Sequence, residues 1–180
     1  MDLSFRFDGW YRRLTKSPKD EGRVQSCVLR PAHGERRRVD ELRVTEDGGI
    51  EGDRWATDEH RRKGSQVSLI NVHVIASLAS DDDDHRALVG DNLHVDLELS
   101  EENLPPGTQL AIGDAVLEVS TELHRPCRQF VERFGATAAK KVARANRLGR
   151  RGRGVLCSVD QAGTIRVGDT IRVSRPAVEP

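Results

Sequence analysis

The stretch that decides the fold is Gln109-Leu-Ala-Ile-Gly-Asp-Ala-Val-Leu-Glu-Val-Ser120. Two short, mainly apolar runs that are typical of strands flank Gly113-Asp114, a dipeptide that favours a tight turn between antiparallel strands. Residues Gly154 to Val159 and Thr164 to Val173 predict the same design, with turns at Ala162-Gly163 and Gly168-Asp169. Many short strands joined by glycine turns are typical of a β-barrel.

Three more strands are expected nearer the N-terminus. Val24 to Leu29 and Val39 to Val44 have strand composition and are separated by a turn at Pro31 to Gly34. Leu93 to Leu99 alternates apolar with polar residues, which predicts a strand with one buried face. The sequence therefore predicts a mostly β protein.

Two helices are expected beside these strands. Ser68 to Ala79 has apolar residues near helical spacing, with Ser68 as a candidate N-cap, and the acidic run Asp81 to Asp84 should be an exposed loop. Arg128 to Leu148 carries an apolar stripe at three- and four-residue spacing, and Gly135 should split that helix. We thus expect peripheral helices around the barrel.

The chain of 180 residues fits one domain. We place the barrel domain at residues 22–174, an N-terminal extension or flap at 1–21 and a tail at 175–180. No secretory signal pattern and no run of roughly 18 apolar residues is present, and the three cysteines have no paired spacing. These features predict a cytoplasmic protein without a membrane span.

Charge is balanced overall but unevenly distributed. Lys plus Arg and Asp plus Glu number 29 each, so the net charge is zero. Residues 78–104 are mainly acidic, whereas residues 122–153 are mainly basic. A basic segment can attract phosphates and other anions, although such segments are more often solvated surfaces. No Walker phosphate loop, dinucleotide fingerprint or zinc motif is present.

The strongest chemical candidate is Cys127, in the stretch His124-Arg-Pro-Cys-Arg-Gln-Phe130. The thiolate is the reactive form of cysteine, and neighbouring arginines together with a helix N-terminus favour it. The alternative is a buried core cysteine, the usual fate of a free thiol, and the residues alone leave both interpretations open. For Cys27 and Cys157, which sit in apolar strands, the core role is favoured.

A second candidate is the loop Gly49-Ile-Glu-Gly-Asp-Arg-Trp-Ala56. Its glycines permit sharp turns, and Arg54 suits bidentate binding of a phosphate or carboxylate. Alternatively, Asp53 and Arg54 tie the loop to the barrel. His124, three residues before Cys127, is a weak candidate for proton transfer.

Several motifs, taken in their order along the chain, resemble the MOSC domain, named for the C-terminal domain of molybdenum cofactor sulfurases, and in particular its small stand-alone bacterial members. The matching stretches span roughly residues 22 to 174. They are Gly49-Ile-Glu-Gly-Asp-Arg-Trp-Ala, Gln66-Val-Ser-Leu-Ile, Val89-Gly-Asp-Asn-Leu, Leu110-Ala-Ile-Gly-Asp-Ala-Val-Leu-Glu-Val, Arg125-Pro-Cys, Arg153-Gly-Val-Leu and Gly163-Thr-Ile-Arg-Val-Gly-Asp.

The resemblance implies a MOSC-type β-barrel in which Cys127 is the functional residue, either as ligand of the metal of a molybdenum cofactor or as carrier of a persulfide. Reduction of N-hydroxylated compounds is one implied activity. Candidates for binding the cofactor's phosphate and pterin are Arg54, Arg125, Arg128, Arg153, Ser68 and Asn92. Ser68 and Asn92 could equally be a helix cap and a turn residue.

The resemblance also implies partners supplied by other chains. Sulfur would come from a donor such as a cysteine desulfurase, and electrons from separate electron-transfer proteins; pyridoxal phosphate is not expected on this chain. Trp55 departs from relatives that have histidine after Gly-Asp-Arg. The competing hypothesis is a non-enzymatic module that binds an anion or nucleic acid through residues 140–153, although this segment lacks the interleaved aromatics that stack on bases, so nucleic acid is not the favoured partner.

Overall fold

The computed structural model describes residues 9–79 and 81–177. The helices are α2 (Val72–Ala76), α3 (Asp83–Ala87) and α4 (Arg128–Arg147), with short 3-10 helices η1 (Arg54–Thr57) and η2 (Lys63–Ser65). The strands are β1 (Glu21–Leu29), β2 (Arg37–Val39), β3 (Glu41–Thr45), β4 (Gly49–Ile50), β5 (Val67–Asn71), β6 (Leu93–Asp96), β7 (Gln109–Ile112), β8 (Ala115–Val119), β9 (Val155–Gln161), β10 (Gly163–Arg166) and β11 (Thr170–Ser174). Parts of the predicted extension (1–8) and tail (178–180) lie outside the described residues.

Within the described residues, seven strands close into a barrel in the order β11-β7-β8-β9-β5-β6-β1, because β1 also pairs with β11. Strand β2 adds to β1, and a small sheet β10-β3-β4 lies beside the barrel. Of these neighbouring strands, β5 and β6 run parallel, and the other recorded pairs are antiparallel. Closure satisfies the strand edges that an open sheet would expose. The predicted β-barrel is therefore confirmed.

The hairpin β7–β8 is formed as its sequence predicts. Ile112 pairs with Ala115 and Gln109 with Glu118, so Gly113 and Asp114 form a two-residue turn. Gly113 has φ of 57°, in the left-handed region that such turns require. Along β8 the residues alternate between buried and partly exposed, so one face packs inside the barrel.

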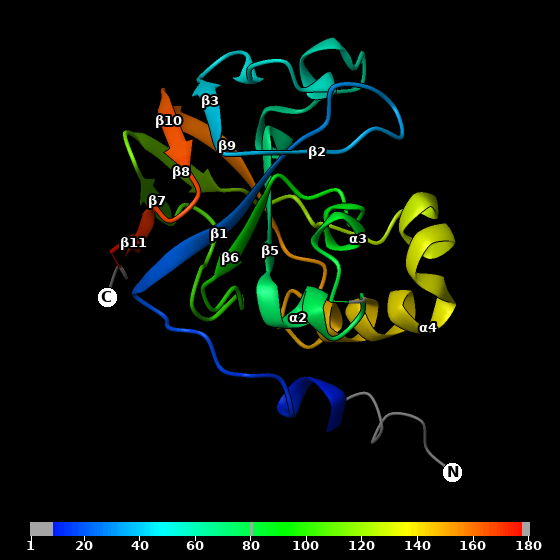
Figure 1. Ribbon diagram of the computed structural model, residues 1–180. Helices are drawn as coiled ribbons and strands as arrows, with labels where there is room; N and C mark the ends of the chain where they lie inside the picture. The colour runs from blue at the N-terminus through cyan, green and yellow to red at the C-terminus, as the bar shows by residue number, and fades with distance from the viewer. Residues whose placement is uncertain (1–8, 80, 178–180) are drawn as a thin grey trace.

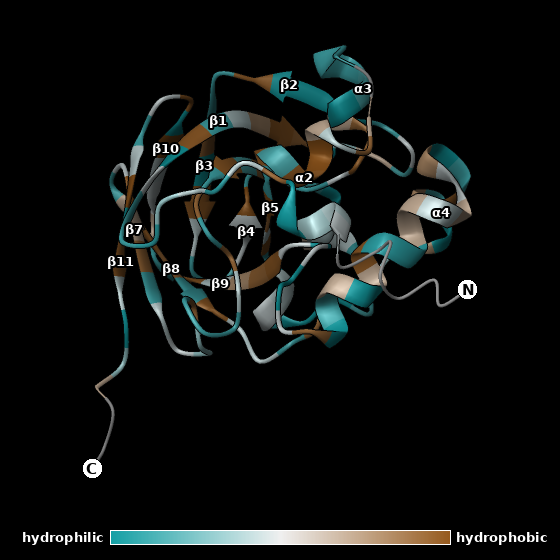
Figure 2. Cartoon of the chain, turned by 90° about the horizontal axis from the view of Figure 1, so that it is seen from below, coloured by the Kyte–Doolittle hydropathy of each residue, from teal (hydrophilic) through white to brown (hydrophobic). Residues whose placement is uncertain are grey.

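Helices α2, α3 and α4 lie together on one side of the barrel, as Figure 1 shows. Aliphatic residues fill the barrel, and a second apolar cluster lies between its wall and α4. In Figure 2, hydrophobic and hydrophilic residues alternate along α4, as expected for a helix with one face on the protein body. Phe130 and Val142 of α4 pack in this second cluster with Ile70 of β5 and Trp10.

The helix predicted over Ser68 to Ala79 is wrong in its first half. Residues 68–71 belong to β5, and the helix α2 begins only at Val72, with Asn71 as its N-cap. Strand β5 is buried on both faces, since Leu69 packs inside the barrel and Ile70 packs in the second cluster. A doubly buried strand has a continuous apolar run, which periodicity alone does not separate from a helix.

Two further expectations need correction. The acidic run is not only a loop, because Asp82 caps α3 and Asp83 and Asp84 form its first turn, where carboxylates are favoured by the helix dipole. The hairpin design predicted for residues 154–173 does not form either. Strand β9 pairs with β5 and β8, whereas β10 pairs with β3 in the small sheet.

The predicted break in α4 is present at Gly135. This residue has φ 82° and ψ 163°, a conformation that is almost exclusive to glycine. The kink separates a first segment, 128–134, from the longer second segment that covers the barrel wall. As a result the residues that follow Cys127 point along a different axis from the rest of the helix.

Candidate functional site

Asp53 is the centre of a buried hydrogen-bond network where the loop after β4 meets the end of β1. Its side chain is fully buried and forms a bidentate pair with Arg30, in which Nε donates to Oδ2 at 2.9 Å and Nη2 donates to Oδ1 at 3.0 Å. The backbone N–H of Trp55 also donates to Oδ1, at 2.9 Å, which caps η1. Charge-assisted bidentate pairs of this kind fix both partners in orientation.

Asn92 and Ser68 extend this network into the barrel. Asn92 Nδ2 donates to Asp53 Oδ2 at 3.0 Å, and its Oδ1 accepts from both the backbone N–H and the hydroxyl of Ser68, at 3.1 Å each. Both side chains are buried. These two candidates for pterin binding thus hold Asp53 and each other, and Ser68 caps no helix.

Arg153 lies in a second buried network. Its guanidinium donates to the Asp91 carboxylate and to the carbonyl oxygen of Val89 (3.0 Å), and it lies over the Phe130 ring at 5.1 Å from the centroid. His124 Nδ1 is 3.3 Å from the other oxygen of Asp91. Burial raises the pKa of Asp91, which Arg153 opposes, and burial followed by repulsion from Arg153 keeps the pKa of His124 well below 6.5. His124 is therefore neutral at pH 7.

Four arginines come together next to these networks: Arg30, Arg36, Arg54 and Arg133. Burial, and then repulsion from Arg133, Arg30 and Arg54, lowers the pKa of Arg36 to about 10. Asp53 is the acid that opposes this effect, and Arg30 already engages it. Within residues 9–79 and 81–177, Arg36, Arg54 and Arg133 form no ion pair with a carboxylate. We call these four residues the arginine cluster.

Two nitrogen atoms of the cluster are buried without partners. The Nε atoms of Arg36 and Arg54 make no hydrogen bond to any described residue. Buried donors are nearly always satisfied in folded proteins, so unpaired ones call for a missing partner. Excess positive charge with free N–H groups is the arrangement that binds a phosphate or a carboxylate.

The first segment of α4 connects Cys127 to the arginine cluster. Arg133 Nη1 donates to the carbonyl oxygen of Leu88 at 2.8 Å, and its Nη2 to that of Gly34 at 3.3 Å. Gln129 Nε2 lies 2.7 Å from Nε2 of His33, in the loop that carries Arg36. Arg133 lies six positions after Cys127, about 9 Å along a helix.

Cys127 itself is exposed and is the N-cap of α4, with φ −88° and ψ 173°. Its thiol makes no capping hydrogen bond. Cys27 and Cys157 are buried in strands, and burial raises the pKa of each thiol to about 12. Of the three cysteines, the structure thus gives Cys127 alone both access and an unused sulfur.

The other predicted anion ligands lie elsewhere. Arg125 is exposed, and Arg128 is 92% exposed and pairs with Glu132, one turn later, at 2.7 Å. Of the predicted arginines, only Arg54 belongs to the arginine cluster. Sequence reasoning missed Arg30, Arg36 and Arg133, which come from three distant segments; the run Arg36-Arg37-Arg38 was the one local signal.

No group of three or more His, Cys, Asp or Glu side chains that could hold a metal ion occurs among the described residues. Within the same residues, no helix combines the length and the apolar character needed to cross a membrane.

The class of fold and site is defined by a seven-stranded barrel with flanking helices, an exposed cysteine at the N-cap position of α4 and an arginine cluster next to the first segment of that helix. The MOSC domain model matches residues 56–172, well over half of the chain. The protein belongs to the MOSC domain family. A search of the curated proteins finds no match.

Solved structures of other proteins have the same fold. The YuaD protein from Bacillus subtilis is 20% identical, with a TM-score of 0.63 over 85% of this chain and 95% of that one. YiiM from Escherichia coli is 22% identical (TM-score 0.58, 87% and 72% covered), and YiiM from Geobacillus stearothermophilus is 14% identical (TM-score 0.56, 86% and 75% covered). At these identities the likeness shows the fold.

Proposed function

We propose that this protein binds a molybdenum cofactor, with Cys127 as the protein ligand of the metal and the arginine cluster as the site of the cofactor's phosphate. The MOSC family is linked to this cofactor. The observation that carries the proposal is the pair of unpartnered Nε atoms of Arg36 and Arg54, next to the segment that bears an exposed thiol.

The residues present fit such a ligand. A cysteine thiolate is a soft ligand for a transition metal, and Cys127 is accessible. Arg36, Arg54 and Arg133 provide positive charge that described carboxylates do not neutralise. The spacing of about 9 Å between Cys127 and Arg133 along the helix suits an elongated ligand with its phosphate at one end.

Each buried network then holds one part of the proposed site in position. The Asp53–Arg30 pair fixes the loop that presents Arg54, and Asn92 holds Asp53 to the barrel wall. Asn146 Nδ2 donates to the carbonyl oxygen of His124 at 2.8 Å, which anchors the segment leading into Cys127. When bound, the cofactor supplies two-electron redox chemistry at its metal, and this chain binds it, orients it and provides the thiolate.

The second candidate is a sulfur carrier in which Cys127 holds a persulfide received from a sulfur donor. The exposure of its thiol supports this role as well. The two candidate functions differ in what the purified protein should contain. Protein from a cofactor-producing host should carry molybdenum and pterin under our proposal, whereas metal-free protein with a persulfide at Cys127, found by alkylation and mass spectrometry, would favour the carrier.

The contacts of residues 140–153 weigh against a nucleic-acid-binding role. Arg153 is buried against Asp91, Arg151 Nη1 donates to the carbonyl oxygen of Leu104 at 2.7 Å, and the Lys141 ammonium lies 5.5 Å from the Trp10 ring centroid. Several cations of this segment thus make intramolecular contacts and do not form one free basic surface. Nucleic-acid binding would fall steeply with salt and survive Cys127→Ser.

A further inference from the structure

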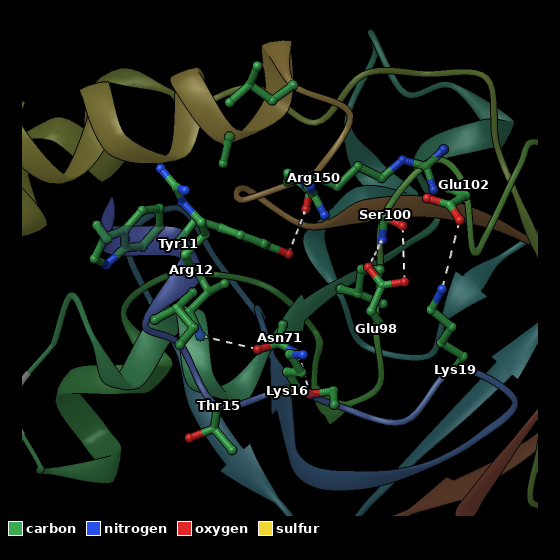
Figure 3. Close-up of a pocket in the computed structure, with 18 of the residues that line it drawn as sticks. Tyr11, Arg12, Thr15, Lys16, Lys19, Asn71, Glu98, Ser100, Glu102 and Arg150 are labelled. Atoms are coloured by element: carbon green, nitrogen blue, oxygen red, sulfur yellow. Dashed lines mark hydrogen bonds and ion pairs between the residues drawn. The ribbon is translucent and has the colours of Figure 1, made fainter. Parts of the chain in front are cut away.

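A cavity of about 650 Å³ lies at the far end of α4 from Cys127. It is bounded by the N-terminal segment from Trp10 to Lys19, by residues 98–102 and by the last turn of α4 with the loop after it. Figure 3 shows Tyr11, Lys16, Asn71, Glu98 and Arg150 around this space. Neither Cys127 nor any member of the arginine cluster lines it.

The charge of this cavity is positive. Six Lys or Arg residues line it, against Glu98 and Glu102. The Glu98 carboxylate already accepts hydrogen bonds from the backbone N–H and the hydroxyl of Ser100, both at 3.0 Å. Glu102 is 3.9 Å from the ammonium of Lys19. The cations of the lining therefore outnumber its acids.

Two of the cations are available to a ligand. Lys16 is exposed and makes no ion pair or hydrogen bond within the described part of the chain. Arg150 is also exposed, and its guanidinium lies 5.7 Å from the Tyr11 ring centroid without a carboxylate partner among the same residues. Both therefore have donors left for an oxyanion.

The inner part of the cavity is apolar and aromatic. Tyr11 and Trp10 meet edge to face, with centroids 6.0 Å apart, and Leu14 and Val74 also line the space. The Trp10 indole N–H donates a hydrogen bond to the hydroxyl oxygen of Ser77 at 3.0 Å, which holds the Trp10 ring in place. Burial and the neighbouring Glu98 raise the pKa of Tyr11, so its phenol stays neutral.

We propose that this cavity is a second binding site, for a small phosphorylated compound with an aromatic ring, whose phosphate contacts Lys16 and Arg150 and whose ring lies against Tyr11 and Leu14. The volume lies in the range of small-molecule sites, which combine an apolar lining with a few placed polar groups. This site is separate from the cofactor site and does not depend on it.

AMP is the probe, compared with adenosine and with inorganic phosphate. The chain has two tryptophans, so the Trp55→Phe variant leaves Trp10, in the cavity wall, as the only fluorescent indole. AMP should change its emission saturably, and calorimetry on the wild-type protein should give the same affinity. Adenosine and phosphate alone should each bind at least about tenfold more weakly, because each lacks half of the contacts.

Variants locate the site. Lys16→Gln and Arg150→Gln should each weaken AMP binding by roughly fivefold or more, whereas Arg125→Gln, an exposed arginine before α4, should leave it unchanged. Cys127→Ser should also have no effect, so the result is independent of the cofactor proposal. The proposal is overturned if AMP does not bind, if adenosine or phosphate binds equally well, or if the two cavity variants bind AMP like the wild type.

Discussion

Arg36 and Arg54 each hold a buried Nε without a partner in the described chain, and the charge of Arg54 is one of the causes that lower the pKa of Arg36 to about 10. Like charges are rarely buried together unless a ligand of opposite charge joins them. The two come from different loops, one after β1 and one after β4. This juxtaposition is the strongest physical argument for an anion at this place.

Arg36→Gln should stabilise the unliganded protein and weaken anion binding. The folded-state pKa of Arg36 lies below its ordinary value, so its charge costs stability at every pH below about 10, and the cost fades above that pH. We expect a gain on the order of 1–2 kcal/mol at pH 7, allowing for screening at a half-buried site. Pyrophosphate should raise the melting temperature of the wild type more than that of the variant.

Arg147→Gln is the matched control, because Arg147 is an exposed arginine in the last turn of α4. It should change neither stability nor the response to pyrophosphate. An Arg36→Gln protein that is less stable than the wild type and responds equally to pyrophosphate would contradict the assignment.

Asp53→Asn should be strongly destabilising. The change removes the buried bidentate acceptor of Arg30 and leaves that guanidinium without its carboxylate. Loss of one partner of a buried ion pair costs about 3–5 kcal/mol. Urea unfolding measures this cost, and Asp114→Asn, at a 77% exposed side chain, should change it by less than about 0.5 kcal/mol. Equal midpoints for the two variants would refute the role of Asp53.

Stability should decline as the pH falls from 6.5 to 4. Burial, followed by repulsion from Arg153, lowers the pKa of His94 to about 4, so in this window the unfolded chain binds a proton that the folded protein excludes. This histidine alone should account for about 3 kcal/mol between pH 7.5 and pH 4. Unfolding at several pH values should give a shallower decline for His94→Gln, whereas the exposed His60→Gln should decline like the wild type.

Gly135→Ala should destabilise the protein and weaken anion binding at the arginine cluster. Gly135 has positive φ with nothing near its absent Cβ, so the strain comes from the backbone alone and amounts to about 1–3 kcal/mol. Gly168, with φ of 91° and equal open space, should lose similar stability as Gly168→Ala. Only Gly135→Ala should weaken the response to pyrophosphate, because it alone shifts the segment that joins Cys127 to Arg133; equal responses would argue against that coupling.

The barrel was predictable because its signals are local. The turn at Gly113-Asp114 is signalled by its own residues, and Gly135 breaks α4 through its own backbone. Strand β5 was mistaken for a helix because both of its faces are buried. The strand pairing of β9 and β10 depends on distant partners and left no trace in the sequence.

The candidate site residues also divide into those with a local signal in the sequence and those without one. Cys127 and Arg54 stand in short motifs that mark them as candidates in the sequence, and the access of the Cys127 thiol agrees with its candidate role. Arg30, Arg36 and Arg133 become neighbours only when the loop after β1 folds against α4. Arg153 looked available because its partner Asp91 is 62 residues away along the chain.

The most direct test of the central claim is the molybdenum and pterin content of protein purified from a host that makes the cofactor. Mass spectrometry for the metal and fluorescence of the oxidised pterin should both approach one per chain in the wild type. Cys127→Ser should lose most of the metal, Arg54→Gln most of both, and Arg147→Gln neither. Wild-type protein that contains neither metal nor pterin, and takes up neither when supplied with the cofactor, would contradict the account.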